Sequence, residues 1–127
     1  MTPAQYMADL KARLVTNSLI ASFEIVEEWT YPDRGYIRIR MRLANRDFLE
    51  TAEYFVFSEG LCLPERYRYQ WMDANQSQLR RRWDNVEHHP NLPNFPHHVH
   101  FEDGHVEPGE NLSTIDLLNV LTNLSLE

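Results

Sequence analysis

Cysteine, lysine and long apolar runs are almost absent from this sequence, and each absence excludes a class of protein. The one cysteine, Cys62, cannot form an internal disulfide, and its apolar neighbours favour a packed thiol over a nucleophile. No apolar run approaches the roughly 20 residues that a membrane helix needs. The N-terminal segment also lacks the basic and apolar order of a secretory signal. We therefore expect a cytoplasmic protein that does not contact a membrane.

Lysine is scarce, since eleven of the twelve basic residues are arginine and one is lysine. The planar guanidinium of arginine suits phosphate and carboxylate groups. The formal net charge of −7 and the pI of about 5.3 nevertheless argue against a protein that coats nucleic acid. Any phosphate-binding surface must therefore be local. We expect it to be formed by strand arginines that are segregated from most carboxylates: Arg38, Arg40, Arg42, Arg66, Arg68, Arg80 and Arg82.

Hydrophobic periodicity predicts a helix at each end of the chain. Residues 2–14 carry an apolar stripe at helical spacing, with Thr2 as the N-cap and Pro3 at the first helical position. Residues 113–126 repeat the pattern after Ser113, which is a second capping residue. The 127 residues show no internal repeat and no interdomain linker, so we expect residues 1–127 to form a single domain with one core.

Between the two predicted helices, apolar and polar residues alternate as they do in half-buried strands. A parallel sheet would need crossover helices, which this part of the sequence lacks. The sequence therefore predicts the α+β class, with an antiparallel meander-like sheet of about five strands that is flanked by the N- and C-terminal helices.

The register of the first hairpin follows from matching apolar residues across it, because a slip of one residue would turn every side chain to the wrong face. This matching predicts that Trp29 pairs with Ile37 and that Ile25 pairs with Met41. The arginines of the second strand then lie on the face opposite its apolar residues.

In the later hairpin we pair Trp71 with Leu79, and the aromatic residues then face the core. Arg80 and Arg82 would share the opposite face of that hairpin. Both sets of residues also have a purely structural interpretation. A row of arginines on a strand often forms only a solvent-exposed face, and aromatic residues on a strand often belong only to the hydrophobic core.

All six histidines lie between His88 and His105, in a segment that also contains three prolines. The prolines restrict the backbone and would hold imidazoles in place at a low entropic cost. His98 and His100 have the i, i+2 spacing that puts two metal ligands on one face of a strand. Neither a helical HExxH motif nor paired cysteines accompany them, so a metal-dependent hydrolase remains an alternative and we expect no metal cofactor. Histidines in such a loop can also simply bond to backbone carbonyls.

Metal-free RNA cleavage needs a base, an acid, and a cation that stabilises the charged phosphorane. Imidazoles and guanidinium groups supply these functions, while aromatic rings hold unstacked bases. We assign catalysis to four histidines: His88, His97, His98 and His100. We assign substrate binding to Arg80, Arg82, Trp83 and Tyr69. His105 is left out because it lies in a polar turn, and His89 supplies a further imidazole without an assigned role.

The segment of residues 66–100, taken as a whole, resembles the signature of the TumE-like family. It reads RYRYQWMDANQSQLRRRWDNVEHHPNLPNFPHHVH. Its pattern is a YxYxWxD strand followed by RWDNxxHHPxxxxFPHHxH, and both parts are present here. One departure is the turn at residues 74–78, where relatives often carry a short Asp-Gly connection. Members of this family are toxins of toxin–antitoxin pairs.

The resemblance implies a growth-inhibiting protein and a cognate antitoxin, often one with a helix-turn-helix domain. It does not fix the reaction. We expect a ribonuclease, because histidine and arginine chemistry suits RNA, although the acidic pI counts against it. A module that binds RNA or protein without cleavage is an alternative, as is an inactive member with a structural histidine loop. A homodimer is also among the expected assemblies.

Overall fold

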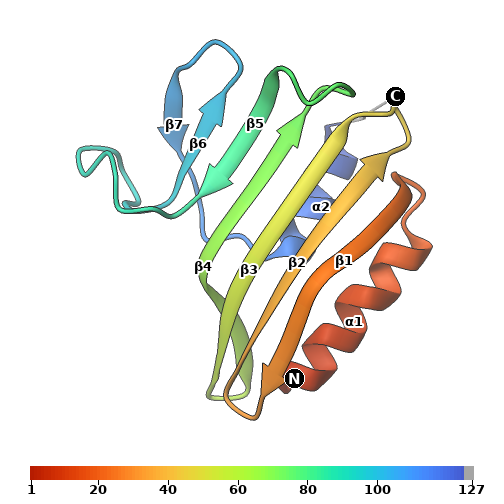
Figure 1. The fold of residues 1–127 in the computed structure, drawn as a ribbon. Coiled ribbons are helices and arrows are strands. Elements are labelled where there is room, and N and C mark those ends of the chain that lie inside the picture. Colours follow the sequence, from red (N-terminus) through yellow and green to blue (C-terminus); the bar gives the residue numbers. More distant parts are fainter. Residues whose placement is uncertain (125–127) are drawn as a thin grey trace.

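A computed structural model describes residues 1–124, in which seven strands form one sheet and two helices lie against it (Figure 1). The elements are α1 (Pro3–Thr16), β1 (Ile20–Tyr31), β2 (Arg34–Leu43), β3 (Phe48–Ser58), β4 (Leu61–Met72), β5 (Leu79–Asp84), β6 (His98–Phe101), β7 (Val106–Pro108) and α2 (Thr114–Asn123). The strands follow one another in the order β1 to β7, and every neighbouring pair is antiparallel. The predicted α+β class and the antiparallel meander are confirmed.

The predicted number of strands, about five, was too small. The two additional strands are β6 and β7, which span only four and three residues. Strands of this length are too short to show a convincing alternation, and β6 begins inside the proline and histidine segment.

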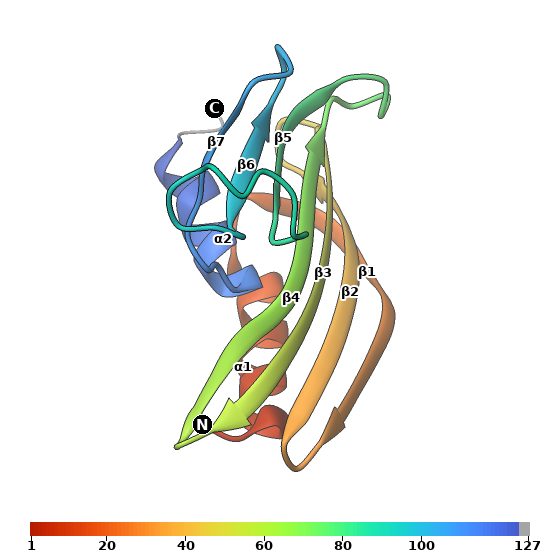
Figure 2. The same cartoon turned by 90° about the vertical axis from the view of Figure 1, so that its left-hand side faces the viewer.

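Both helices begin where the sequence predicts, because each has a complete capping box. The Thr2 hydroxyl accepts a hydrogen bond from the backbone N–H of Gln5, and Ser113 accepts one from Asp116. Both helices lie on the same face of the curved sheet (Figure 2). We call this the inner face and the opposite one the outer face. The last two residues of the predicted C-terminal helix, 125 and 126, lie outside the described residues.

The alternation predicted for β2 is also confirmed. Ile37, Ile39 and Met41 are buried against the helices. The arginines between them lie on the outer face, so the predicted separation of apolar and basic residues on this strand holds.

The predicted pairing of the first hairpin was wrong. Its turn is only two residues long, and two bulges interrupt β1, so Trp29 pairs with Tyr36 and Ile25 pairs with Ile39. The bulge between Ile25 and Glu27 changes which face the following residues occupy. Trp29 consequently leaves the inner face and stacks on Tyr36, with the ring centroids 5.9 Å apart.

The later hairpin is displaced as well, since Trp71 pairs with Arg81 rather than with Leu79. Its aromatic residues do face the core, as predicted. A bulge beside Trp71 sends Arg80 to the inner face, where its Nε lies 3.4 Å from an Asp47 oxygen that also accepts the Trp71 indole N–H. Arg82 lies on the outer face, so the two arginines do not share a face as predicted.

A buried carboxylate joins the helices to the sheet. Glu53 of β3 is fully buried and lies beside the N-terminus of α2. Its oxygens accept hydrogen bonds from the Tyr6 hydroxyl, and from both the backbone N–H and the hydroxyl of Thr114. Burial, as the largest effect, raises the pKa of Glu53. These donors fix the positions of α1 and α2 relative to β3.

A search of the described helices found none that is both long and apolar enough to cross a membrane.

Candidate functional site

The candidate site lies on the outer face of β5 and β6. Arg82 pairs with His100 and Asp84 pairs with His98 across these two strands. Because side chains alternate along a strand, all four project from the same face, while the intervening Trp83 is buried in the core on the other.

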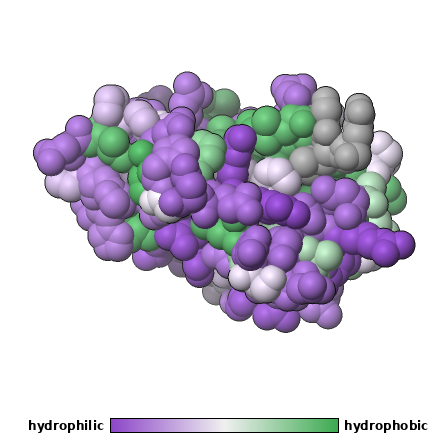
Figure 3. Space-filling view, turned by 90° about the horizontal axis from the view of Figure 1, so that it is seen from above, coloured by the Kyte–Doolittle hydropathy of each residue, from purple (hydrophilic) through white to green (hydrophobic). Residues whose placement is uncertain are grey.

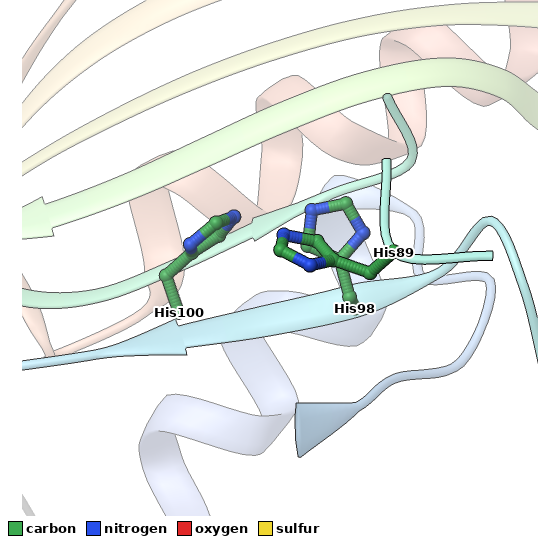
Figure 4. Close-up of side chains that lie close together, drawn as sticks. All are labelled: His89, His98 and His100. Atoms are coloured by element: carbon green, nitrogen blue, oxygen red, sulfur yellow. The ribbon is translucent and has the colours of Figure 1, made fainter. Parts of the chain in front are cut away.

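The segment between β5 and β6 folds back over this face. Val86 anchors its beginning by donating its backbone N–H to Asp84 Oδ1, 3.1 Å away. His89 has a positive φ of 58° and turns its imidazole toward β6. Its ring centroid lies 5.3 Å from that of His98 and 5.9 Å from that of His100, and the three rings approach one another in Figure 4. We call His89, His98, His100 and Asp84 the histidine cluster.

Asp84 is the electrostatic centre of this cluster, although it is only 3% exposed. Its Oδ1 lies 2.8 Å from His98 Nε2, and its Oδ2 lies 3.1 Å from the Nε of Arg82. The Nε2 of His100 is 3.6 Å from the same Oδ2. The negative charge of Asp84 is therefore balanced on one side by Arg82 and faces imidazoles on the other.

The imidazole of His100 is held neutral at ordinary pH. Burial is the largest effect that lowers its pKa, and the neighbouring Arg82 lowers the pKa further. A guanidinium nitrogen of Arg82 lies 3.1 Å from His100 Nε2. Because arginine can only donate, His100 Nε2 accepts this hydrogen bond and carries a lone pair.

His98 is almost completely buried, and its two ring nitrogens have different surroundings. Nδ1 lies 2.8 Å from the carbonyl oxygen of Pro96, which can only accept a hydrogen bond. Nδ1 therefore carries a proton. Nε2 is close to Asp84 Oδ1, yet it makes no aligned hydrogen bond to any residue between 1 and 124.

The remainder of the outer face carries arginine and aromatic side chains. Trp29, Tyr36 and Tyr54 line a hollow of about 620 Å³, together with arginines from β2 and β4. Glu50 lies farther along the face and accepts hydrogen bonds from Arg38 and Arg40. The basic residues there are therefore partly neutralised.

The end of the sheet formed by the β4–β5 and β6–β7 turns has a different character. Viewed from this end, the surface outside the grey atoms is mainly hydrophilic, with small and separated hydrophobic areas (Figure 3). Aromatic rings and guanidinium groups nevertheless occur together at this end too, because Trp71 and Phe101 line a second hollow of about 510 Å³ with Arg80 and Arg81.

Comparison with known proteins assigns a family. The sequence profile described as Toxin TumE matches residues 10–124, which include the whole sheet and the histidine cluster. The chain belongs to the TumE family. No curated protein and no solved structure matched it. Membership confirms the resemblance seen in residues 66–100, and it makes the chain the toxin of a toxin–antitoxin pair with an antitoxin as its partner.

In this TumE family toxin, the four histidines predicted to be catalytic do not all come together. His98 and His100 lie side by side, with ring centroids 4.8 Å apart, and Arg82 adjoins them. His97 is separate, because its ring stacks on Tyr67 and its Nδ1 lies 2.9 Å from the Tyr67 oxygen. His88 is exposed and adjoins only His89 among the histidine rings of the described chain.

The residues predicted to bind substrate are also dispersed. Tyr69 is fully buried and donates its hydroxyl hydrogen to the carbonyl oxygen of Leu112. Trp83 is 4% exposed and packs in the core. Arg80 lies on the inner face beside Asp47. Of the four residues, Arg82 alone adjoins the histidine cluster.

Two members of the cluster received no role from sequence reasoning. Asp84 stands two residues after Arg82 in the RWDN motif, and this spacing would have placed both on one strand face had the strand limits been known. His89 joins the cluster only because the loop folds back, and local periodicity contains no signal for such a fold.

Proposed function

We propose that this toxin inhibits growth by cleaving RNA, which binds across the outer face and reacts at the histidine cluster. The observation that carries the proposal is the direct contact between the guanidinium of Arg82 and the neutral imidazole of His100. A cation and a base within one hydrogen bond of each other are the central requirements of RNA cleavage.

The outer face supplies features that suit single-stranded RNA. Unstacked bases bind to aromatic rings, and Trp29, Tyr36 and Tyr54 present such rings around one hollow. Arg66 and Arg68 line the same hollow and can bind phosphates. Arg68 also lies opposite Asp84 in the pairing of β4 with β5, so one wall of the hollow adjoins the strand that carries the histidine cluster.

A metal-free reaction assigns roles to Arg82, His100 and His89. Arg82 turns from His100 toward the phosphate and stabilises the charge of the phosphorane. His100 Nε2 then takes the proton of the ribose 2′-hydroxyl, whose oxygen forms a bond to phosphorus. The bond from phosphorus to the 5′-oxygen breaks, and that oxygen receives a proton from His89, which is exposed at the edge of the cluster.

A metal-dependent hydrolase at the same cluster is the second candidate. It is favoured by one observation, which is the buried Nε2 of His98 without an aligned hydrogen bond. A module that binds RNA or protein without cutting it would use the outer face but would not need the cluster. We also propose that the toxin acts in the cytoplasm, that its antitoxin carries a helix-turn-helix domain, and that a homodimer is one of its assemblies.

The test is to incubate purified toxin with total RNA and to compare four proteins. We expect wild type to cleave the RNA, and His100→Ala and Arg82→Ala to lose about 100-fold or more of the rate. His105→Ala is the matched control, since His105 lies in the β6–β7 turn and contacts Asp103 and Glu107. It should cleave like wild type.

Circular dichroism establishes that each variant is folded. Equal cleavage by wild type and His100→Ala would contradict the proposed site. Tight RNA binding by wild type without any cleavage would support the binding module instead.

A further inference from the structure

We propose that the histidine cluster is a binding site for one divalent transition-metal ion, with His89, His98, His100 and Asp84 as its ligands. Ligand-capable atoms of the three histidines all lie within 4.8 Å of one another. As a binding site, the proposal depends on geometry alone. As part of catalysis, it rests on the metal-dependent form of the proposed function, because a bound ion would occupy the His89 and His100 nitrogens that the metal-free reaction uses.

The strongest argument comes from His98. Its Nδ1 donates to the Pro96 carbonyl oxygen, so a neutral ring has an unprotonated Nε2. This lone pair then faces Asp84 Oδ1 at 2.8 Å, and two acceptors so close together repel one another unless a proton or a metal ion is shared between them; Arg82 does not fill this place, because it binds Oδ2. A metal ion bound to both atoms would satisfy them.

The surroundings of His98 match those of known metal-binding histidines. Such residues almost always donate the N–H of the other ring nitrogen to a carbonyl or a carboxylate, which fixes the tautomer and the orientation of the ring. The Pro96 carbonyl has this position here. It belongs to the segment that immediately precedes β6, so the same short stretch of chain supplies the ligand and its orienting partner.

Asp84 can serve the ion and Arg82 at the same time. Its Oδ2 binds Arg82, whereas its Oδ1 faces His98. The carboxylate therefore has separate oxygens for the guanidinium and for the metal. Its negative charge also offsets the repulsion between Arg82 and a bound cation.

The identity of the ligands narrows the choice of metal. Three imidazoles and one carboxylate suit Zn²⁺, Mn²⁺ or Co²⁺, whereas Mg²⁺ and Ca²⁺ prefer oxygen ligands. Two nitrogen ligands of a tetrahedral Zn²⁺ lie about 3.3 Å apart at ordinary bond lengths. The imidazoles must therefore approach one another slightly. His89 is exposed on a loop and can supply this movement, while β6 holds His98 and His100.

The test measures metal binding directly. Protein freed of metal with dipicolinate is titrated with Co²⁺ while its visible absorption is recorded, and with Zn²⁺ in a calorimeter. We expect one ion per chain, and a dissociation constant at least tenfold weaker in His89→Ala and in His100→Ala. His88→Ala is the matched control, because His88 is the exposed neighbour of His89 in the same loop.

The control should bind Co²⁺ like wild type. At an equal concentration, Zn²⁺ should raise the melting temperature of wild type and of the control more than that of His89→Ala. Because His98 is buried and its replacement can unfold the protein, the substitutions are made at the two more accessible histidines. Absence of Co²⁺ binding to wild type, or equal binding by His89→Ala, would overturn the site.

An RNA-cleavage assay on the same samples separates this inference from the proposed function. Metal binding at the cluster without cleavage of RNA under any condition would support the site and contradict the ribonuclease. Cleavage by protein that binds no metal would support the ribonuclease and overturn the metal site.

Discussion

Glu53 and Asp84 are two of the three carboxylates buried within residues 1–124, and their surroundings differ in a way that separates a structural from a functional role. Glu53, on the inner face, is surrounded by neutral donors from both helices, which are the Tyr6 hydroxyl and two groups of Thr114. Asp84, on the outer face, is surrounded by Arg82 of its own strand and by the imidazoles of His98 and His100 on the neighbouring strand β6.

The source of the partners explains the difference. The partners of Glu53 come from distant parts of the chain, so the carboxylate holds the fold together. Asp84 and its partners come from two adjacent strands that main-chain hydrogen bonds already join. Asp84 is therefore not needed to join these strands, and the exposed His89 adjoins its partners His98 and His100. The comparison predicts that removing Glu53 affects mainly stability, and that removing Asp84 affects mainly activity.

The largest effect on stability is expected for Glu53→Ala. This change leaves the donors of Tyr6 and Thr114 buried without an acceptor, at a cost of about 1–3 kcal/mol for each unsatisfied group. We expect the free energy of unfolding to fall by about 3 kcal/mol or more in chemical denaturation. Glu50→Ala is the control, because Glu50 makes partly exposed ion pairs that contribute about 0–1 kcal/mol. If the free energy of unfolding fell no further in Glu53→Ala than in Glu50→Ala, the structural role of Glu53 would be contradicted.

Asp84→Asn should show the opposite behaviour. The amide keeps the size of the side chain but removes the charge that holds Arg82 and faces His98. We expect cleavage of RNA to fall about 100-fold while the melting temperature stays within a few degrees of wild type. Enzyme assays and thermal denaturation of the same sample check both parts. If Asp84→Asn unfolded, and its activity fell only as far as the fraction of folded protein, Asp84 would be a structural carboxylate like Glu53.

A smaller effect is expected for Tyr36→Ala on the outer face. Its ring stacks on Trp29 beside the hollow, and loss of one stacked base costs about 1–3 kcal/mol of RNA binding. Fluorescence anisotropy with a labelled single-stranded RNA measures the change in Kd. Phe23→Ala is the control, because Phe23 is an exposed aromatic residue of β1 that does not line the hollow. Equal losses in Tyr36→Ala and Phe23→Ala would contradict RNA binding in the hollow.

The smallest effect concerns pH. The pKa of Glu53 is raised in the folded protein, so folding favours its protonated form. The corresponding contribution to stability is complete below the unfolded pKa of about 4.3 and is lost as the pH rises through the folded pKa. We expect Glu53→Gln, which is neutral throughout, to show a weaker decline in stability above that pH than wild type. Urea titrations at several pH values give the free energy of unfolding of both proteins. If Glu53 did not cause the decline, this free energy would fall equally with pH in wild type and in Glu53→Gln.

The features that sequence predicted correctly are those with local causes. Thr2 and Ser113 mark helix starts through contacts within one turn. The alternation of apolar and polar residues along β2 predicts which of its side chains are buried. Strand pairing was wrong because the first hairpin has a turn of only two residues and because bulges beside Ile25 and Trp71 shift the pairs beyond them, and periodicity encodes neither feature.

The site was predicted only in part for the same reason. The i, i+2 spacing of His98 and His100 correctly indicated one strand face. His97 was grouped with them because it lies in the same motif, although it precedes β6 and its ring stacks on Tyr67. Asp84 adjoins them through the pairing of β5 with β6, and His89 through the folding of a loop with little secondary structure. No local pattern specifies either contact.

The central claim is that the histidine cluster carries the toxicity. Its most direct test is growth of cells in which wild type, His100→Ala or His105→Ala is induced without antitoxin, with the amount of soluble toxin and the integrity of RNA measured in each culture. We predict growth arrest and RNA degradation with wild type and His105→Ala, and neither with His100→Ala at an equal soluble amount. Full growth arrest by soluble His100→Ala would contradict the account.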